Sequence, residues 1–442
     1  MYRFFANGLV AQLNRAPDSG SDGRGFESRR GHRCTVMMEK LKRHALVTVL
    51  LALFALCAVR ASAQKSNDTY TGEKHDSIEF SLLTCSAGNE IYSLFGHTAI
   101  RYRNITQGRD WTFNYGVFNF KQKHFAWRFA TGKTDYELGV CPYATFVKEY
   151  AEHGRSITEQ VLNLTAEQKV VLEYYLSINM QPENRTYRYN YFRRNCTTEA
   201  RDKIFSVLPQ YCDGEEPLEK QSFRQAIHEY TEGHEWSELA MDLCLGYEAD
   251  RKQTKDVLEF LPFNLKQSLD STSYIIDADT CRLVNGTHTI KAQGQLAQDE
   301  FPLTPLQSLA IVAIIIIVLF FRDFNKEHAE WVMDVILLTV MALAGCVLMV
   351  IMLGEHPCVR CNLNFLLLNP LAFLAIPYII IADKKKRHSH WWTYYETVFL
   401  MLLLVDIVGL QDIPTAVEVL ASFLLIRSLE RRILIRINKT KR

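Results

Sequence analysis

The sequence lacks a surplus of charge of either sign. Its 442 residues include 50 Lys and Arg against 49 Asp and Glu, which leaves a formal net charge of +1. Nucleic-acid binding draws on a basic surplus, so the overall charge gives no argument for a nucleic-acid partner. Repeats and low-complexity tracts are also missing after residue 63, and the length leaves room for about two or three ordinary domains.

Apolar residues are plentiful but unevenly distributed. The chain is mixed and soluble-looking up to about residue 300, whereas the region after it is dominated by apolar runs. Five runs are visible: 305–321, 331–353, 363–382, 393–410 and 414–427. A membrane-spanning helix needs about 20 apolar residues, so the last run is short for a span. We therefore predict a transmembrane domain of about five helices at 301–428, followed by a basic tail at 429–442.

The first 63 residues have the features of a processed leader. Basic residues Lys40–Arg43, the apolar run Ala45–Val59 and small residues ending at Ala63 follow the order of a secretory signal peptide. We assign the signal peptide to 37–63 and expect cleavage after Ala63. Residues 1–36 are polar, rich in Arg, Gly and Ser, and look like the conceptual translation of a transfer-RNA gene, so we interpret them as an extension that the real protein lacks.

The basic segments predict how the chain crosses the membrane. If the signal exports residues 64–300, the first span reaches the cytoplasm near Arg322 and the third ends at Lys384–Arg387. Lys and Arg accumulate on the cytoplasmic side of membrane proteins, and an odd number of spans leaves the basic tail there too. We expect a multi-pass protein of the bacterial inner membrane, with its soluble domain in the periplasm and its C-terminus in the cytoplasm.

The exported region, 64–300, is long enough for one sizeable core. Alternating apolar residues predict strands, and a capping pattern at Thr165 predicts the start of a helix. The expected strands are Ser77–Thr84, His97–Arg103 and Trp111–Val117, with a hairpin at 273–290. The expected helices are 145–153, 165–179 and one beginning at Cys196. Strands followed by helices indicate an α+β domain ahead of the all-α membrane part.

Two short motifs in this domain carry chemistry. Ser93–Arg101 places His97 at the start of a predicted strand, and Arg193–Thr198 places Cys196 at the start of a predicted helix. A thiol with its free pKa of about 8.5 is mostly protonated at neutral pH. A neighbouring imidazole and the positive end of a helix both favour the thiolate, which is the nucleophilic form.

A structural role for these two residues is the alternative. A lone cysteine usually packs as a small hydrophobe, and a lone histidine on a strand is usually a hydrogen-bonded core residue. The polar run Arg185–Arg194, the position of Cys196 at a predicted helix start and the small neighbour Gly96 favour the chemical reading. We also single out Asn195, directly before Cys196, as a candidate auxiliary residue. Asn114 or Glu90 could orient the imidazole, and the sequence does not choose between them.

The motifs containing His97 and Cys196, together with Phe113–Gly116 and Asn362–Pro370, resemble the Lnb family of lipoprotein N-acyltransferases from about residue 76 onward. More distantly, a His that precedes an Asn-Cys pair resembles lecithin retinol acyltransferase and other circularly permuted papain-like enzymes. The resemblance implies that Cys196 takes an acyl chain from a phospholipid as a thioester and that His97 is its base. The acceptor is then the α-amine of a diacylglyceryl-cysteine lipoprotein, and no cofactor or metal is implied.

Aromatic and basic residues at 118–129 fit a surface that meets the bilayer, although an ordinary aromatic core is equally compatible with them. Arginines are the candidates for binding the lipid phosphate. Those we single out are Arg101, Arg128, Arg193 and Arg194.

The cysteines outside the Cys196 motif fall mostly on the exported side, where disulfides can form, but their pairing cannot be read from the sequence. Cys358–Cys361 resembles the loop motif of a membrane oxidoreductase. No second exposed pair stands out, so a structural role is favoured over a redox role. His356 and this pair could suggest zinc, but no fourth ligand is evident.

Three classes of function remain open. The first is the lipoprotein N-acyltransferase. The second is a periplasmic papain-like cysteine hydrolase of peptidoglycan or peptides, in which water resolves the thioester. The third is a non-catalytic module that binds lipids or lipoproteins. The membrane anchor and the aromatic, basic segment favour the first.

N-terminal sequencing of the precursor tests the interpretation of the leader. We expect translation to start at Met37 or Met38, because the residues before them show none of the features of a signal peptide. Finding Tyr2 in the precursor would contradict this prediction.

Overall fold

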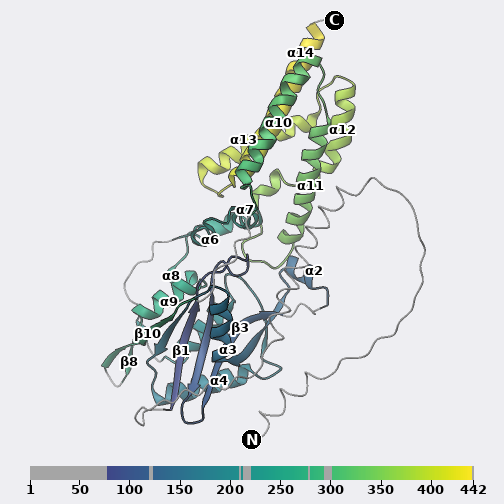
Figure 1. The fold of residues 1–442 in the computed structure, drawn as a ribbon. Helices are drawn as coiled ribbons and strands as arrows, with labels where there is room; N and C mark the ends of the chain where they lie inside the picture. The colour runs from purple at the N-terminus through teal and green to yellow at the C-terminus, as the bar shows by residue number, and fades with distance from the viewer. Residues whose placement is uncertain are drawn as a thin grey trace, which may run out of the picture. The chain divides into compact units, whose positions relative to one another are not determined.

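The computed structural model describes residues 77–118, 123–208, 211–212, 221–276, 279–292 and 301–440. All of them belong to one compact unit of the chain, which begins at Ala63. The predicted extension and signal peptide, 1–63, lie outside the described residues. The described chain forms an α+β sheet domain, 77–292, followed by a helical domain, 301–440, as the sequence predicts (Figure 1).

A seven-stranded antiparallel sheet organises the sheet domain, with the strand order β10-β5-β1-β2-β3-β4-β6. Its strands are β1 (Ile78–Cys85), β2 (His97–Asn104), β3 (Arg109–Phe118), β4 (Asp135–Pro142), β5 (Ile157–Leu162), β6 (Thr186–Arg188) and β10 (Val284–Ile290). The three strands predicted from alternation are confirmed as β1, β2 and β3. Strands β4, β5 and β6 were not predicted.

The hairpin expected at 273–290 is only partly correct. Strands β8 (Ser273–Ile276) and β9 (Asp279–Arg282) do pair, in a small sheet with β7 (Tyr211–Cys212). Strand β10 leaves this hairpin and pairs with β5 at the edge of the main sheet. The alternation of residue types marks a strand but does not say which strand it pairs with.

Helices cover both faces of the main sheet. Helices α4 (Ala166–Asn179), α5 (Cys196–Phe205) and α9 (Pro262–Ser271) share a buried apolar cluster with side chains from β1, β2 and β3. Helix α3 (Tyr143–Glu152) forms a second cluster with side chains from β1, β2 and β5, which include Leu83, Ala99 and Ile157. Alternate residues of each strand thus pack against different helices, as the two-residue period of a strand requires.

The remaining elements of this domain are short. They are α2 (Phe125–Ala130), α6 (Phe223–Thr231), α7 (Glu235–Cys244), the 3-10 turn η1 (Tyr247–Asp250) and α8 (Lys255–Leu258). The cap predicted at Thr165 is confirmed: its hydroxyl accepts from the Gln168 amide, and the Gln168 side chain accepts from the Thr165 amide.

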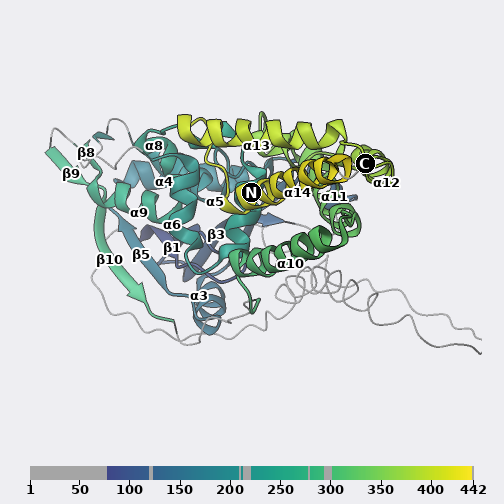
Figure 2. The same cartoon turned by 90° about the horizontal axis from the view of Figure 1, so that it is seen from above.

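The helical domain contains five long or medium helices and one short turn. They are α10 (Pro305–Lys326), α11 (Val332–Met352), η2 (Leu363–Leu366), α12 (Ala372–Lys384), α13 (His390–Val408) and α14 (Thr415–Thr440). Helix α14 lies between α10 and α13 (Figure 2). Among the described residues, α10, α11 and α13 are long and apolar enough to cross a membrane.

Two predicted spans differ from the observed helices. The run 363–382 begins as the 3-10 turn η2 and becomes α-helical only at Ala372, after Pro370, which lacks the amide hydrogen that a helix joining the two segments would use. The run 414–427 is the first half of α14, which continues without interruption through the predicted boundary at 428 to Thr440. The expected basic tail is therefore, over its described residues, the last part of a helix.

Buried charges hold the helical domain together at one end. The cluster comprises two arginines and four carboxylates from α10, α11, α12 and α14: Arg427, Arg431, Asp323, Asp334, Asp383 and Glu430. The Arg427 side chain is fully buried, and it lies 2.8 Å from Asp334 and 2.6 Å from Glu430. A charge in such a place is tolerated only with partners, so these ion pairs fix the order of the helices.

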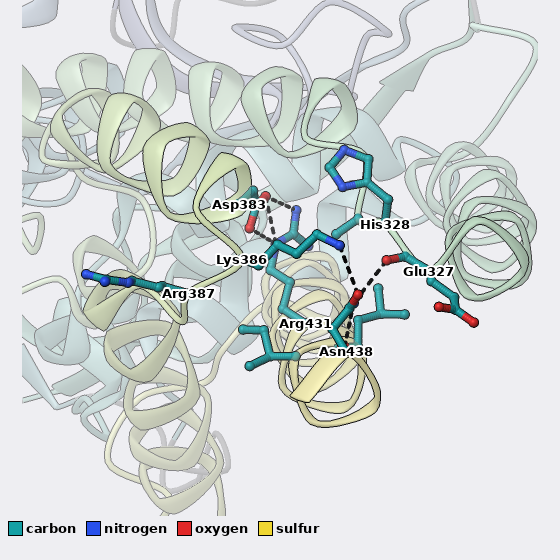
Figure 3. A pocket seen from close by; sticks show the side chains of 10 residues that line it. Glu327, His328, Asp383, Lys386, Arg387, Arg431 and Asn438 are labelled. Carbon is teal, nitrogen blue, oxygen red and sulfur yellow. Dashed lines mark hydrogen bonds and ion pairs between the residues drawn. The ribbon is translucent and has the colours of Figure 1, made fainter. Parts of the chain in front are cut away.

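A small pocket lies beside this cluster, where the helix ends meet (Figure 3). Lys386 donates a hydrogen bond of 2.9 Å to the Asn438 side chain, which in turn donates one of 3.1 Å to the backbone oxygen of Glu327. The pocket thus joins the ends of α10, α12 and α14. None of the residues that line it was predicted as a site residue.

The charge cluster predicts the effect of Arg427→Gln. The substitution leaves four buried carboxylates facing one arginine, and breaking a buried ion pair from one side costs about 3–5 kcal/mol. We expect a large fall in the thermal unfolding temperature of the purified protein in detergent. Arg436→Gln, on the same helix but exposed, is the control and should leave the temperature unchanged. Equal behaviour of the two variants would contradict a stabilising role for the cluster.

Candidate active site

The first residues of two secondary-structure elements, far apart in the sequence, lie close together in the sheet domain. His97 is the first residue of β2, and Cys196 is the first residue of α5. Their neighbours Thr98 and Thr197 share a hydrogen bond of 3.1 Å between their hydroxyls, both of them buried. Beside this link, the imidazole of His97 lies within hydrogen-bonding reach of the Cys196 thiol.

Asn195 determines where α5 begins and therefore where the thiol lies. Its side-chain oxygen accepts hydrogen bonds of 2.9 Å from the amides of Thr197 and Thr198. Its side-chain nitrogen donates to the backbone oxygens of Tyr191 and Phe260, at 3.0 and 2.8 Å. The cap both satisfies the first turn and ties it to neighbouring segments. Cys196 is thereby held at the positive end of the helix dipole.

The structure distinguishes the two residues that could orient the imidazole. Nε2 of His97 lies 2.5 Å from the side-chain oxygen of Asn114, on the neighbouring strand β3. The carboxylate of Glu90 instead accepts a 2.7 Å hydrogen bond from Ser93. Because Asn114 accepts the proton on Nε2, the other ring nitrogen, Nδ1, is the one available to Cys196. The three side chains form a thiol–imidazole–amide series.

The pair changes the ionisation of both its members. Burial by itself raises the pKa of Cys196, but the charge of His97, a hydrogen bond with it and hydrogen bonds with Thr98 and Thr197 outweigh burial and lower the pKa to about 7. Burial by itself lowers the pKa of His97, yet the charge of Cys196 and the hydrogen bonds with Cys196 and Asn114 raise it overall. Each group therefore stabilises the charged form of the other.

Gly116 leaves space beside the thiol. It has φ of +91°, in the region that favours glycine, and β3 has a register irregularity against β4 between Asn114 and Val117. A Cβ at Gly116 would lie 3.5 Å from the Cβ of Cys196. Bulges of this kind are common next to active sites, where they redirect the strand. Here the bulge places the backbone of Gly116, which carries no side chain, next to Cys196.

Comparison with protein-family models finds two matches in this chain. Residues 68–231 match the Lnb N-terminal periplasmic domain, and residues 297–439 match the Lnb transmembrane domain. The two matches together cover more than half of the sequence and follow the same order as the sheet and helical domains. The chain belongs to the Lnb family. Comparison with curated proteins and with solved structures finds no match.

As a member of the Lnb family, the protein is a multi-pass membrane protein whose sheet domain is periplasmic. The segment after α11 joins the two domains. The backbone nitrogen of Glu355 donates to the oxygen of Thr131, just after α2, and the His356 side chain lies 2.8 Å from the oxygen of Phe129. Helix α2 is therefore held at the end of a membrane-spanning helix.

Helix α2, which contains part of the aromatic and basic segment 118–129, has no buried residue. The side chains of Trp127 and Phe129 are 62% and 53% exposed, whereas an ordinary aromatic core would bury them. Phe120 lies outside the described residues. Exposed rings at the end of a span have the position and chemistry of an interfacial anchor. This arrangement favours the bilayer-facing interpretation of α2.

Most of the predicted phosphate-binding arginines already have carboxylate partners. Arg101 contacts Asp110 and Glu159 at 2.6 and 3.0 Å. Arg128 contacts Asp135 at 2.5 Å, and Arg194 contacts Glu199 at 2.6 Å. Arg193 is exposed, and no ion pair joins it to another residue in the described part of the chain.

A further cation, not predicted from the sequence, lies beside His97. The guanidinium of Arg155 lies 4.6 Å from the ring centre of Tyr150, and that ring is stacked on the imidazole of His97. Its Nε donates 2.8 Å to the backbone oxygen of Ser86, while one terminal nitrogen is buried without a partner in the described structure. Arg155 follows the turn after α3, where no motif marks it.

The described residues include one group that could ligate a metal: His228, Glu238 and Asp242. Asp242 already accepts a 2.7 Å hydrogen bond from the buried guanidinium of Arg224, and Glu238 accepts one of 2.5 Å from Thr231. A cation on Asp242 competes with a metal for the same oxygen, so the group fits an ion-pair network better than a metal site.

The Cys358–Cys361 pair lies in the segment between α11 and η2. Cys358 is buried in an apolar cluster that also contains Phe95 and Phe192, and Cys361 is exposed. Every cysteine in the described part of the chain is a free thiol. Phe95 precedes Gly96 and His97, so Cys358 packs against the segment that leads into the site. This position fits the structural role favoured from the sequence.

The lowered pKa of Cys196 predicts a pH profile for thiol alkylation. Since the thiolate is the reactive form, we expect the iodoacetamide reaction rate of Cys196 to rise with pH, with a midpoint near 7. In His97→Ala, burial remains but the compensating charge is lost, so the midpoint should move above the ordinary thiol value. Cys361, which is exposed, is the internal control in both proteins. A profile that His97→Ala leaves unchanged would contradict the pairing.

Proposed function

We propose that this protein is a lipoprotein N-acyltransferase in which Cys196 is the nucleophile, His97 the general base and Asn114 the residue that orients His97. The observation that carries the proposal is the thiol–imidazole–amide series at the start of α5, in a chain of the Lnb family. We further propose that the C-terminus is cytoplasmic, because α14 ends in basic residues. The circularly permuted papain-like topology remains a prediction from the order of His97 and Cys196.

The first half of the proposed reaction loads the thiol. The Cys196 sulfur forms a bond with an ester carbonyl carbon of a membrane phospholipid, and the carbonyl electron pair moves to oxygen. Collapse of this intermediate restores the carbonyl and breaks the bond to the glycerol oxygen. The His97 imidazolium then gives its proton to that oxygen, so a lysophospholipid leaves and a thioester remains.

The second half transfers the acyl chain to an amine. The neutral α-amine of a diacylglyceryl-cysteine lipoprotein attacks the thioester carbonyl, and its proton passes to His97. Collapse forms the amide and expels the Cys196 thiolate, which restores the imidazolium–thiolate pair. The chain's own residues suffice for both halves, and neither step draws on a redox group.

Features around the pair support a lipid donor. Trp127 and Phe129 on α2 can enter the interface of the bilayer, and Arg155 supplies a positive charge beside His97 for a lipid phosphate. A hydrolase of peptidoglycan or peptides could use the same His97 and Cys196, with water in place of the amine. The exposed rings of α2, which is held against the end of α11, favour the lipid reaction, since a soluble polymer requires no contact with the bilayer.

Cells that carry Cys196→Ser test the proposed function. We expect lipoprotein N-terminal peptides to lose one N-linked acyl chain in mass spectrometry, because serine is a much weaker nucleophile at neutral pH than a thiolate. Cys361→Ser, at an exposed thiol outside the pair, is the control and should keep the triacylated form. Altered muropeptides with unchanged lipoproteins would identify the hydrolase instead. No change in either would indicate a non-catalytic binding module.

A further inference from the structure

One buried phenol beside Cys196 has no hydrogen-bond partner. Tyr187 lies on β6 at the edge of the main sheet, between two exposed residues, and is itself only 6% exposed. Its hydroxyl is buried and finds no partner in the described part of the chain. A buried hydroxyl left unbonded costs free energy, so its retention in a packed site calls for an explanation.

The hydroxyl faces the space that Gly116 leaves open. A Cβ built at Gly116 would lie 4.0 Å from the Tyr187 hydroxyl oxygen and 3.5 Å from the Cβ of Cys196. The Tyr187 hydroxyl and the Cys196 side chain therefore border the same space, which is about the size of a methyl group and lies over the backbone of Gly116. Because the Cβ of Cys196 borders this space, we expect the oxygen of an acyl group on the Cys196 sulfur to reach it.

We propose that Tyr187 is a catalytic residue that donates a hydrogen bond to the oxyanion formed when Cys196 attacks a carbonyl. The inference rests on the proposed function only in its choice of substrate, since any acyl group on Cys196 passes through the same oxyanion. A fixed donor aimed at the developing charge stabilises the transition state more than the substrate.

The surroundings of Tyr187 keep its hydroxyl protonated and in place, so that it can donate a hydrogen bond. Burial, and after it the charge of Cys196, raise the pKa of its phenol well above the usual value, so the hydroxyl retains its proton at neutral pH. The Arg194 guanidinium lies 5.1 Å from the centre of the ring and the ring of Tyr115 packs against its edge, so the phenol is held in place. The hydroxyl is thus positioned before the substrate arrives.

Two other tyrosines provide matched comparisons. Tyr115 is buried next to Tyr187, but its hydroxyl donates 3.0 Å to the side chain of Asn179. Tyr191 also has a buried hydroxyl without a partner in the described structure, and its ring packs against Phe95 and Phe260. The Tyr191 hydroxyl does not lie within 4 Å of a Cβ built at Gly116.

The test separates acylation of Cys196 from its simple alkylation in the full-length protein. We compare wild type with Tyr187→Phe, Tyr115→Phe and Tyr191→Phe, using p-nitrophenyl butyrate and phospholipid vesicles as acyl donors. Acylation passes through an oxyanion, whereas alkylation by iodoacetamide does not. We expect Tyr187→Phe to slow acylation by roughly 100-fold, the usual effect of removing one oxyanion donor. Its alkylation rate, alkylation pH profile and unfolding temperature should stay at the wild-type values.

Each alternative outcome overturns a stated part of the argument. Unchanged acylation in Tyr187→Phe, or an equal loss in Tyr115→Phe, would refute the assignment of Tyr187. A selective loss in Tyr191→Phe would also refute it and would transfer the role to that phenol. Parallel losses of acylation and alkylation would reveal a structural effect and refute the catalytic role. Wild type that accepts p-nitrophenyl butyrate but never phospholipid would refute the proposed donor while leaving the inference about Tyr187 intact.

Discussion

The structure of the site depends on the interaction between the imidazole of His97 and the sulfur of Cys196. His97 and Cys196 are both first residues of their elements, so the position of each depends on where β2 and α5 begin. The Thr98–Thr197 hydrogen bond fixes the two starts relative to each other, and Asn195 fixes the start of the helix. A half-buried thiolate is costly without a counter-charge, which His97 supplies. The ionisation of each residue therefore depends on the other.

The two domains handle buried charge in different ways. In the helical domain, Arg427 is fully buried but has three carboxylate partners, so its charge serves to hold helices together. In the sheet domain, Arg101 is likewise neutralised by two carboxylates. The pair of His97 and Cys196 contains no carboxylate, and Asn114 contacts His97 without adding charge. Burial has the largest effect on the pKa of Cys196 and raises it, and the charge of His97 is the largest of the effects that lower it.

Sequence patterns predicted the parts of this structure that depend on local interactions. Strands β1, β2 and β3, the cap at Thr165 and the domain boundary near residue 300 follow from periodicity and capping, which are local. The pairing of β10 with β5 is not a local interaction, because it joins segments far apart in the chain. Tyr187 and Arg155 were missed for the same reason: nothing in their neighbouring residues marks them, and only the folded sheet brings them to Cys196. The choice of Asn114 over Glu90 also required the register of β2 and β3.

Contacts between α2 and the segment after α11 join the sheet domain to the helical domain. Backbone and side-chain contacts join Thr131 and Phe129, at the end of α2, to Glu355 and His356, at the end of α11. A domain on a flexible linker would sample many heights above the membrane, whereas these contacts limit the orientations available to α2. In the proposed reaction, the donor and acceptor lipids are confined to the same surface, so holding the domain there raises the effective concentration of both. Under the proposed function, lipid access to Cys196 depends on both domains, and we expect the sheet domain alone to keep the thiol chemistry but lose this proximity.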